Sequence, residues 1–270
     1  MKHFILALAA GLVVDYLYAQ GFTAPSGSFS RMAGSCSLTE KNIWSAINNP
    51  AGLTLSPKPE FGFFSEQRFR LPELKSAALA FSYPFKYLHA GLSYQYYGLT
   101  GFNEQRLNLS VARLLNRSVR LGVCLAYQNL QVSEYGNTGT FILGTGIRIA
   151  LSDQTACGIY LHNLSLAHYA HQPETPLPVY ARFGLSHQVA KTVTLLGEWE
   201  QGYSTVQQTR MGLRYAPQPY FMLAIGYHTA PDTYSFGTGL RYKNLLIQFS
   251  CSVHLQLELT PAIDLIYVIQ

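Results

Sequence analysis

From Pro59 onward, apolar side chains alternate with polar or small ones at a period of two residues. In the segment SVRLGVCLAYQ, Val, Leu and Tyr fall on one face, and Arg, Gly, Cys, Ala and Gln fall on the other. The pattern recurs in TFILGTGIRIA, YFMLAIGYHT and NLLIQFSCSVHL. Such a period is typical of β-strands, whose successive side chains point to opposite faces. The sequence therefore predicts an all-β fold.

The composition indicates the solvent in which these strands lie. Of 270 residues, 48% are hydrophobic and 12% are charged, whereas a soluble domain carries about 25% charged residues. Past the N-terminus, no run reaches the roughly 18 unbroken apolar residues of a membrane helix. This combination is typical of a transmembrane β-barrel, and the 19 Tyr and 15 Phe suit the aromatic girdles of such barrels.

A soluble β-sandwich also alternates, but its polar face is usually richer in Lys, Glu and Asp. Here the second face consists mainly of Gly, Ala, Ser, Gln, His and Arg. Small and weakly charged residues are expected of a packed or plugged lumen, so the barrel is favoured.

The alternation predicts fourteen antiparallel strands. Most have about the 9–11 residues that a tilted strand needs to cross a bilayer, and bacterial single-chain barrels have an even number of strands. The expected ranges are 59–66, 76–84, 87–97, 104–114, 118–131, 138–151, 155–164, 178–189, 192–202, 206–216, 219–230, 233–243, 245–256 and 262–269.

The links between these strands alternate in length. QRFRLPELK precedes the short FK, GLTGFN precedes NRS, VSEYGN precedes SDQ, and the long SLAHYAHQPETPL precedes AK. Outer-membrane barrels have short periplasmic turns and longer outside loops. The rhythm therefore predicts an outer-membrane barrel whose first strand rises from the periplasm.

The N-terminus has the pattern of a secretory signal. Lys2 and His3 are basic, residues 4–14 are apolar, and a small residue precedes a cleavage site ahead of Gln20. We therefore predict a signal peptide at 1–19, an N-terminal hatch or plug at 20–58 and a transmembrane barrel at 59–270. The expected location is the bacterial outer membrane.

Residues 31–58 do not alternate and contain partly helical patterns. Residues 37–40 (SLTE) offer a capping pattern, and the segment ends in the motif Asn49-Pro50-Ala51-Gly52-Leu53. A fourteen-stranded barrel is wide enough to leave a lumen. Asn49 can hydrogen-bond to a polar wall, Pro50 stops a helix and Gly52 permits close approach. This favours a lumen plug over a plain surface turn before the first strand.

The segment GSCSLTEKNIWSAINNPAGLTL resembles the N-terminal signature of the FadL/PorV superfamily of outer-membrane barrels. The match at Asn49 to Leu53 is complete. The resemblance implies a fourteen-stranded barrel with a hatch folded into its lumen. The C-terminal third resembles the PorV/PorQ branch, known from type IX secretion in Bacteroidota, through 226–227 (GY), 234–237 (YSFG), 239–242 (GLRY) and His254.

Six arginines share the phase that we assign to the lumen. Charges cannot face lipid cheaply, because an Arg at the bilayer midplane costs about 2–4 kcal/mol. The functional interpretation is an anion-attracting pore or a carboxylate-holding site, and the structural one is a ladder that braces the wall and the hatch. The six are Arg106, Arg120, Arg148, Arg182, Arg214 and Arg241.

No motif in the sequence indicates catalysis, a metal or a cofactor. Neither G-x-S-x-G nor H-E-x-x-H occurs, and the four cysteines share no metal-ligand spacing. A net charge of +5, with no Lys/Arg run, does not suggest nucleic acid as a partner. We predict a non-enzymatic protein without catalytic or metal-binding residues.

Two functions follow from this sequence. The first is a subunit or accessory of a protein secretion or outer-membrane assembly complex, with outer-membrane lipid and a larger protein complex as partners. The alternative is a FadL-like passive transporter of small hydrophobic molecules such as fatty acids, with a hydrophobic small molecule as ligand.

Overall fold

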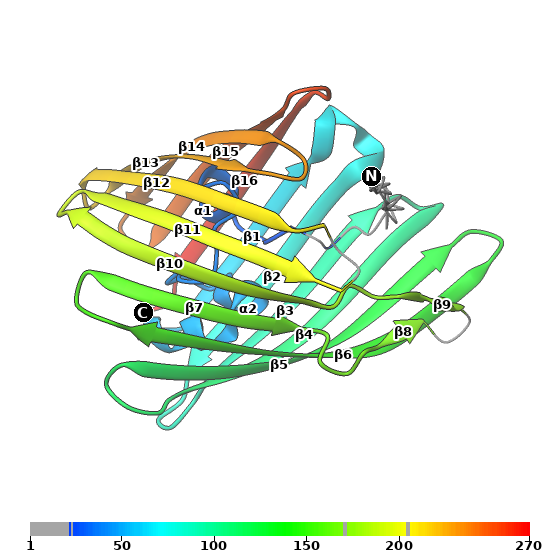
Figure 1. Ribbon diagram of the computed structural model, residues 1–270, viewed down its shortest axis with the longest axis horizontal. Coiled ribbons are helices and arrows are strands. Elements are labelled where there is room, and N and C mark those ends of the chain that lie inside the picture. Colours follow the sequence, from blue (N-terminus) through cyan, green and yellow to red (C-terminus); the bar gives the residue numbers. More distant parts are fainter. Residues whose placement is uncertain (1–21, 23, 170–171, 204–205) are drawn as a thin grey trace, which may run out of the picture.

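The computed structural model describes residue 22 and residues 24–169, 172–203 and 206–270. Fourteen antiparallel strands close into a single barrel (Figure 1), as the alternation predicts. The barrel closes where the first strand pairs with the last, with Glu60 opposite Val268. The strands are β1 (Glu60–Gln67), β2 (Lys75–Pro84), β3 (His89–Gly98), β4 (Phe102–Leu114), β5 (Val119–Val132), β6 (Gly136–Ala150), β7 (Thr155–His162), β10 (Tyr180–Ala190), β11 (Val193–Gly202), β12 (Gln208–Gln218), β13 (Phe221–His228), β14 (Thr233–Tyr242), β15 (Leu245–His254) and β16 (Leu259–Val268).

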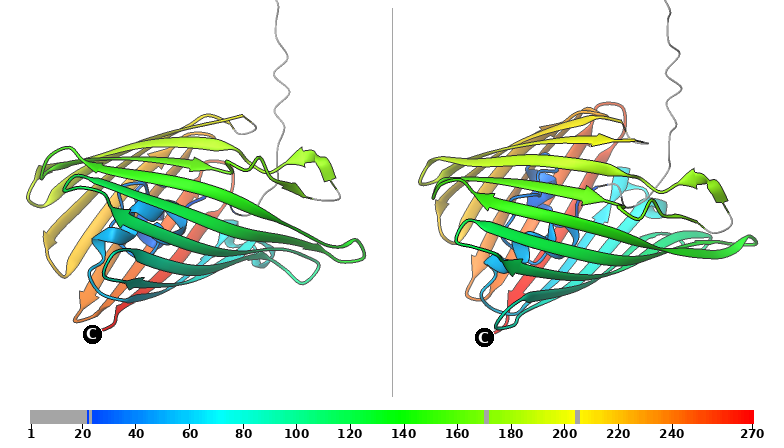
Figure 2. Two further views of the ribbon diagram at one scale, coloured as in Figure 1. Left: turned by 90° about the horizontal axis from the view of Figure 1, so that it is seen from below. Right: turned by 60° about the horizontal axis from the view of Figure 1, so that its bottom comes forward.

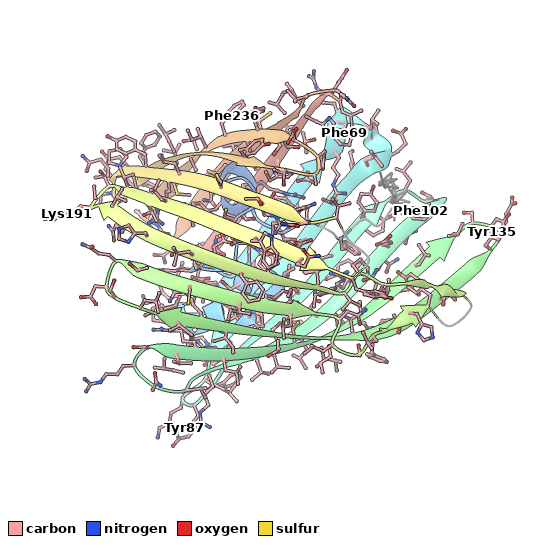
Figure 3. The ribbon with its side chains drawn as sticks, viewed as in Figure 1. Phe69, Tyr87, Phe102, Tyr135, Lys191 and Phe236 are labelled. Atoms are coloured by element: carbon pink, nitrogen blue, oxygen red, sulfur yellow. The ribbon has the colours of Figure 1, made fainter. Side chains whose placement is uncertain are left out.

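The two ends of the barrel differ in their connections. The links after β2, β4, β6, β10, β12 and β14 are two to four residues long and lie at one end, which we call the turn end. The links at the other end, the loop end, include the long segment between β7 and β10. Short turns are periplasmic in outer-membrane barrels, so we expect the turn end to face the periplasm. The β5–β6 hairpin projects from the loop end, with Tyr135 near its tip (Figures 2 and 3).

The long link SLAHYAHQPETPL, between β7 and β10, has some regular structure of its own. It contains a two-stranded sheet of β8 (His168–Tyr169) and β9 (Gln172–Pro176). The Tyr169 side chain is buried with Leu177 against the inward-facing Ile142. Tyr169 also accepts a hydrogen bond of 2.9 Å from the Gln128 amide. This link therefore folds inward over part of the lumen. Alternation could not predict this arrangement, because the link packs through single residues and not through a periodic face.

The outside of the barrel is apolar. Along β5, Val123, Leu125 and Tyr127 are exposed, whereas the residues between them are buried. Phe236 on β14 likewise lies on the outer surface (Figure 3). An apolar outer face is what a lipid-facing barrel requires. Exposed aromatic residues lie toward both ends, among them Phe85, Tyr87, Tyr220 and Tyr242 near the turns and Phe102, Phe141 and Tyr234 toward the loops.

Residues 24–58, which precede β1, run inside the barrel (Figure 1). Its short helices are α1 (Ser28–Met32), α2 (Ser45–Asn48) and the 3₁₀ helix η1 (Pro50–Leu55). We call residues 24–58 the plug, and their burial confirms the predicted lumen plug. The capping pattern at 37–40 suggests that a helix starts there, but no helix starts at these residues. The next helix begins at Ser45 and has no side-chain cap.

No helix in the described part of the chain is long and apolar enough to cross a membrane. The signal peptide predicted at residues 1–19 lies outside the described residues.

Candidate functional site in the plugged lumen

Small residues on the inner wall allow the plug to approach the strand backbones. A Cβ added at Gly158 would lie 2.8 Å from the Cβ of Leu38, and one added at Gly122 would lie 2.8 Å from the Cβ of Pro50. Real Cβ atoms do not approach so closely, so these glycines are required by contact with the plug. The small residues at the inward-facing positions of the strands thus make room for the plug.

The motif at 49–53 lies where η1 packs against β3, β4, β5 and β6. Asn49 is buried, and its side-chain amide donates to the carbonyl oxygens of Leu38 at 2.8 Å and Ile147 at 3.3 Å. Its Oδ1 accepts from the Ala51 amide at 3.3 Å and so caps η1, in which Pro50 takes the first position.

Gly52 and Leu53, the last two residues of the motif, are also surrounded by other residues. A Cβ on Gly52 would lie 2.8 Å from the Glu40 carbonyl oxygen, and Leu53 is 1% exposed beside Ala46 and Ala112. The motif therefore joins the plug to itself and to one side of the wall.

Apolar plug residues form the core of the barrel. Ile43 and Trp44 are fully buried against Phe64 and Ile266 on the wall. The Trp44 ring meets the Phe64 ring edge to face at 5.9 Å between centroids. Burying a Leu- or Ile-sized side chain contributes about 1.5–3 kcal/mol, so these contacts are a main source of plug stability.

Asp264 on β16 holds two plug donors. Its Oδ2 accepts from the Trp44 indole Nε1 at 2.8 Å and from the Ser28 amide at 3.1 Å. The side chain is completely buried. Hydrogen bonds to a buried carboxyl fix the position of two parts of the plug relative to the last strand.

An ionic network ties a third part of the plug to the wall. Arg182 and Arg210 both contact Glu200, at 2.6 Å and 2.7 Å, and Arg210 lies 3.9 Å from Glu198. One oxygen of Glu198 accepts from the amides of residues 37 and 38, at 2.5 Å and 2.6 Å. Opposite charges compensate one another here, as buried charges require.

Arg31 in α1 pairs with Glu66 at 2.7 Å, and Glu66 also contacts Arg68 at 3.0 Å. Burial lowers the pKa of Arg31 to about 10, and the nearby Glu66 opposes that shift. The guanidinium remains charged at neutral pH, so the pair is a second ionic link between plug and wall.

Glu40 is a buried carboxyl within the plug. Burial raises its pKa well above the ordinary value of 4.5, although hydrogen bonds from Asn42, at 2.5 Å, and Asn48 work in the opposite direction. The neighbouring carboxyls of Asp264 and Glu198 reinforce the upward shift. Glu40 is therefore a group of the plug whose charge depends on pH.

On the loop side of the plug, charged and aromatic side chains of the described residues pack against one another in the lumen. Arg106 donates to Gln128, His162 stacks on Tyr180 with centroids 4.7 Å apart, and Arg182 lies over the Tyr180 ring. Arg106, His162, Tyr180, Arg182 and Asn48 line a cavity, the loop-end cavity, with a volume of about 20 Å³. That is room for about one water molecule.

On the other side of the plug lies a larger space, the turn-end cavity, with a volume of about 460 Å³. Its wall extends from the plug to the β4–β5 and β6–β7 turns. Polar and apolar groups both line it, among them Glu40, Lys41, Arg120, Arg148, Arg214, Arg241, Phe29 and Leu246.

The six arginines singled out in the sequence are divided between these regions. Arg106 and Arg182 are buried near the loop-end cavity, and Arg182 belongs to the ionic network. The other four line the turn-end cavity: Arg120, Arg148, Arg214 and Arg241.

Sequence reasoning missed Arg210, Glu198 and Glu200, which form most of the ionic network. The alternation could have identified them. Arg210 lies four residues before Arg214 and so faces the same side of the strand, and the two glutamates are two residues apart and so share one face.

The described residues contain no group of three or more His, Cys, Asp and Glu that could hold a metal ion. All four cysteines are free. The lumen therefore offers ionic, hydrogen-bonding and apolar contacts as its means of binding.

The sequence matches no family model and no curated protein. Solved structures with a similar fold include the monoaromatic hydrocarbon channel CymD, with a TM-score of 0.70 and 12% identity over 91% of this chain and 98% of that one. The Ralstonia pickettii toluene transporter TbuX has a TM-score of 0.68 and 12% identity, over 92% and 100% of the two chains. A Pseudomonas aeruginosa FadL homologue has a TM-score of 0.63 and 12% identity, over 92% and 98%.

At such identities the likeness concerns the fold, and it supports the FadL-like part of the resemblance found in the sequence. It does not support the narrower PorV/PorQ assignment, type IX secretion or a role in protein transport. The chain has the fold of the FadL-like fourteen-stranded outer-membrane barrels.

Proposed function

We propose that this protein is a non-enzymatic outer-membrane channel for the passive passage of small hydrophobic molecules. The observation that carries the proposal is the closed fourteen-stranded barrel with an N-terminal plug in its lumen. Barrels of this fold include proteins described as monoaromatic hydrocarbon channels and toluene transporters. The apolar exterior supports placement in the outer membrane.

The packing of the lumen sets a condition on such passage. The loop-end cavity, at about 20 Å³, is far smaller than an aromatic molecule, so a molecule that crosses must displace plug or wall. The plug meets the wall through separate ionic, hydrogen-bonded and apolar contacts on different strands. We infer that passage requires movement of the plug.

A cross-link between plug and wall tests both statements. A Cβ added at Gly212 on β12 would lie 3.1 Å from the Cβ of Ala33 in the plug and 2.5 Å from the Ala33 carbonyl oxygen. A small shift of the plug backbone at Ala33 relieves that contact and brings the two Cβ atoms to the roughly 3.5–4.5 Å of a disulfide. The double variant Ala33→Cys/Gly212→Cys is expressed in bacteria lacking their own channel for hydrophobic molecules. Uptake of radiolabelled toluene and of a long-chain fatty acid is then measured.

The expected result is uptake by the unmodified protein, loss of uptake by the oxidised double variant and recovery after reduction. The two single cysteine variants are the controls for the substitutions themselves. Absence of uptake by the unmodified protein contradicts the channel. If that protein instead purifies from native membranes with a stoichiometric larger partner, the secretion or assembly role gains the support that it now lacks.

A further inference from the structure

The turn-end cavity holds an excess of positive charge. Arg117, Arg120, Arg148, Arg214 and Arg241 line it together with Lys41 of the plug. The acidic residues that line the same cavity are Glu40, which is buried and hydrogen-bonded within the plug, and Asp153 in a turn. None of these five arginines makes an ion pair within 4.0 Å with a carboxylate of the described residues. This contrasts with the ionic network on the other side of the plug.

Arg120 and Arg148 form the centre of this positive cluster. They are directly opposite each other in the register of β5 and β6, and both occupy inward positions. Like charges placed opposite each other across two strands are destabilising. Two adjacent arginines without an acidic partner therefore need a negative group that the protein itself does not supply.

Unused donors point to the same place. Arg148 is only 4% exposed, yet its Nε has no hydrogen-bond partner among the described residues. The Nε and Nη1 of Arg120 and the Nε of Arg214 are likewise buried and without a partner there. A buried donor that makes no hydrogen bond lowers the stability of the fold, and more so when the donor is charged. Several such donors around one cavity indicate a missing acceptor.

Lys41 adds a cation from the plug side. Its pKa is lowered, first by partial burial and then by the positive charges of Arg148, Arg214 and Arg120. The plug thus presents an ammonium group to the same three guanidinium groups. An arrangement of this kind concentrates a positive potential within the cavity.

We propose that the turn-end cavity is a binding site for a multivalent oxyanion of the phosphate or sulfate class, held by Arg120, Arg148 and Lys41. Guanidinium forks match the geometry of such oxyanions and bind them with two hydrogen bonds. Arg214 contributes positive charge from another wall, while Arg241 interacts with Glu60 and is not part of the site. The site lies on the periplasmic side of the plug and is independent of the passage of hydrophobic molecules.

The anion is either free in solution or part of a larger molecule. Phe29, Leu55 and Leu246 also line the cavity, so there is apolar surface for the body of a phosphate ester. Inorganic phosphate and hexyl phosphate are therefore used as two probes. Equal affinity for both identifies a free anion as the ligand, and tighter binding of hexyl phosphate identifies a phosphorylated amphiphile.

Binding is measured by isothermal titration calorimetry on the purified full-length barrel in an anion-poor, uncharged detergent buffer. The unmodified protein is expected to bind, and Arg148→Gln and Arg120→Gln each to bind about tenfold more weakly or worse, since a charge-assisted hydrogen bond contributes about 1.5–3 kcal/mol. Arg113→Gln is the matched control. Arg113 lies on the neighbouring strand near the same end, but it is exposed on the outer phase.

Thermal unfolding separates this proposal from a purely structural role of the arginines. Without phosphate, Arg148→Gln should melt at the same temperature as the unmodified protein or higher, because a like-charge repulsion is removed. With phosphate, only the unmodified protein and Arg113→Gln should gain stability. The proposal is overturned if millimolar phosphate neither binds nor stabilises the unmodified protein, or if Arg148→Gln binds phosphate equally well. Uptake of hydrophobic molecules is assayed separately, so either proposal can fail alone.

Discussion

Asp264 shows how much of the lumen depends on a single side chain. It is completely buried and accepts hydrogen bonds from the Trp44 indole and the Ser28 amide. A substitution that removes the carboxyl leaves both donors buried without an acceptor.

Asp264→Ala is therefore expected to lower the free energy of unfolding by about 2–5 kcal/mol, because each unsatisfied donor costs about 1–3 kcal/mol. Urea unfolding in lipid vesicles, followed by Trp fluorescence, measures the change. Glu73→Ala, at an exposed acid in the β1–β2 link, is the control and should leave the stability unchanged. A change below 1 kcal/mol in the Asp264 variant would show that the plug finds another acceptor.

Glu40 makes plug stability depend on pH. Its pKa is raised in the folded state by burial, from an ordinary 4.5. The protonated form is thus favoured by folding, and its contribution is fully present below pH 4.5 and is lost as the pH rises through the raised pKa. Above that pH, folding must bury a charged carboxylate.

Glu40→Gln is expected to remove this part of the pH dependence. The melting temperature of the variant should exceed that of the unmodified protein increasingly as the pH rises above 4.5, and the two should converge in acid. Melting is followed by circular dichroism across acidic and neutral buffers. Parallel curves for the two proteins would mean that Glu40 does not titrate differently in the folded state.

The ionic and hydrogen-bonding partners of the lumen could be predicted only in part. Period-two phase directs charged residues inward, and it applies equally to Arg210, Glu198 and Glu200. Which charges meet cannot be read from phase. Trp44 and Asp264 are 220 residues apart, and their contact depends on strand register and on the path of the plug.

At the scale of elements, the wall and the plug are complementary surfaces. Glycines and alanines of the inward phase lie opposite the larger plug residues, as Gly158 does opposite Leu38. Alternation predicts the fourteen strands, because successive side chains of a strand face lipid and lumen in turn, and each environment selects its own residue types. The short helices of the plug and the β8–β9 sheet show no such pattern in their sequences, since their packing depends on strands that are distant in the chain.

Gly146 on β6 provides a test of this complementarity. A Cβ added there would collide with the Asn49 side chain and lie 3.2 Å from Pro50 Cδ. Gly146→Ala is expected to lower the free energy of unfolding by about 1–3 kcal/mol, the usual cost of overpacking, and to raise single-channel conductance as the plug shifts.

Gly197→Ala on β11 is the matched control, because a Cβ at that position meets no atom within 4 Å. The two variants are compared by urea unfolding and by planar-bilayer recording. Equal stability and conductance in both variants would mean that the wall accommodates the added methyl group without moving the plug.

At the scale of the whole molecule, the barrel is apolar on the outside and polar or small within, with the plug supplying much of its core. Leu125 lies midway along β5 and is 46% exposed. If that surface contacts lipid, a charge placed there must be stripped of water, and one placed beyond the bilayer need not be.

Leu125→Arg is thus expected to make folding into lipid vesicles less favourable by about 2–4 kcal/mol. Tyr135→Arg, near the tip of the β5–β6 hairpin and 89% exposed, should have no such cost. Both are measured by refolding from urea into vesicles. Equal effects of the two substitutions would place the bilayer elsewhere on the barrel.

The route of the plug also has a consequence for the order of assembly. η1 packs against β3–β6, which lie in the first half of the chain as η1 does, but α1 packs against β13–β16. The Ser28–Asp264 and Gly34–Ser235 contacts join residues 236 and 201 positions apart. Contacts of such long range form late in folding. The plug is made before every strand of the barrel, yet it is among the last parts to reach its final place. Its packing requires the complete set of strands.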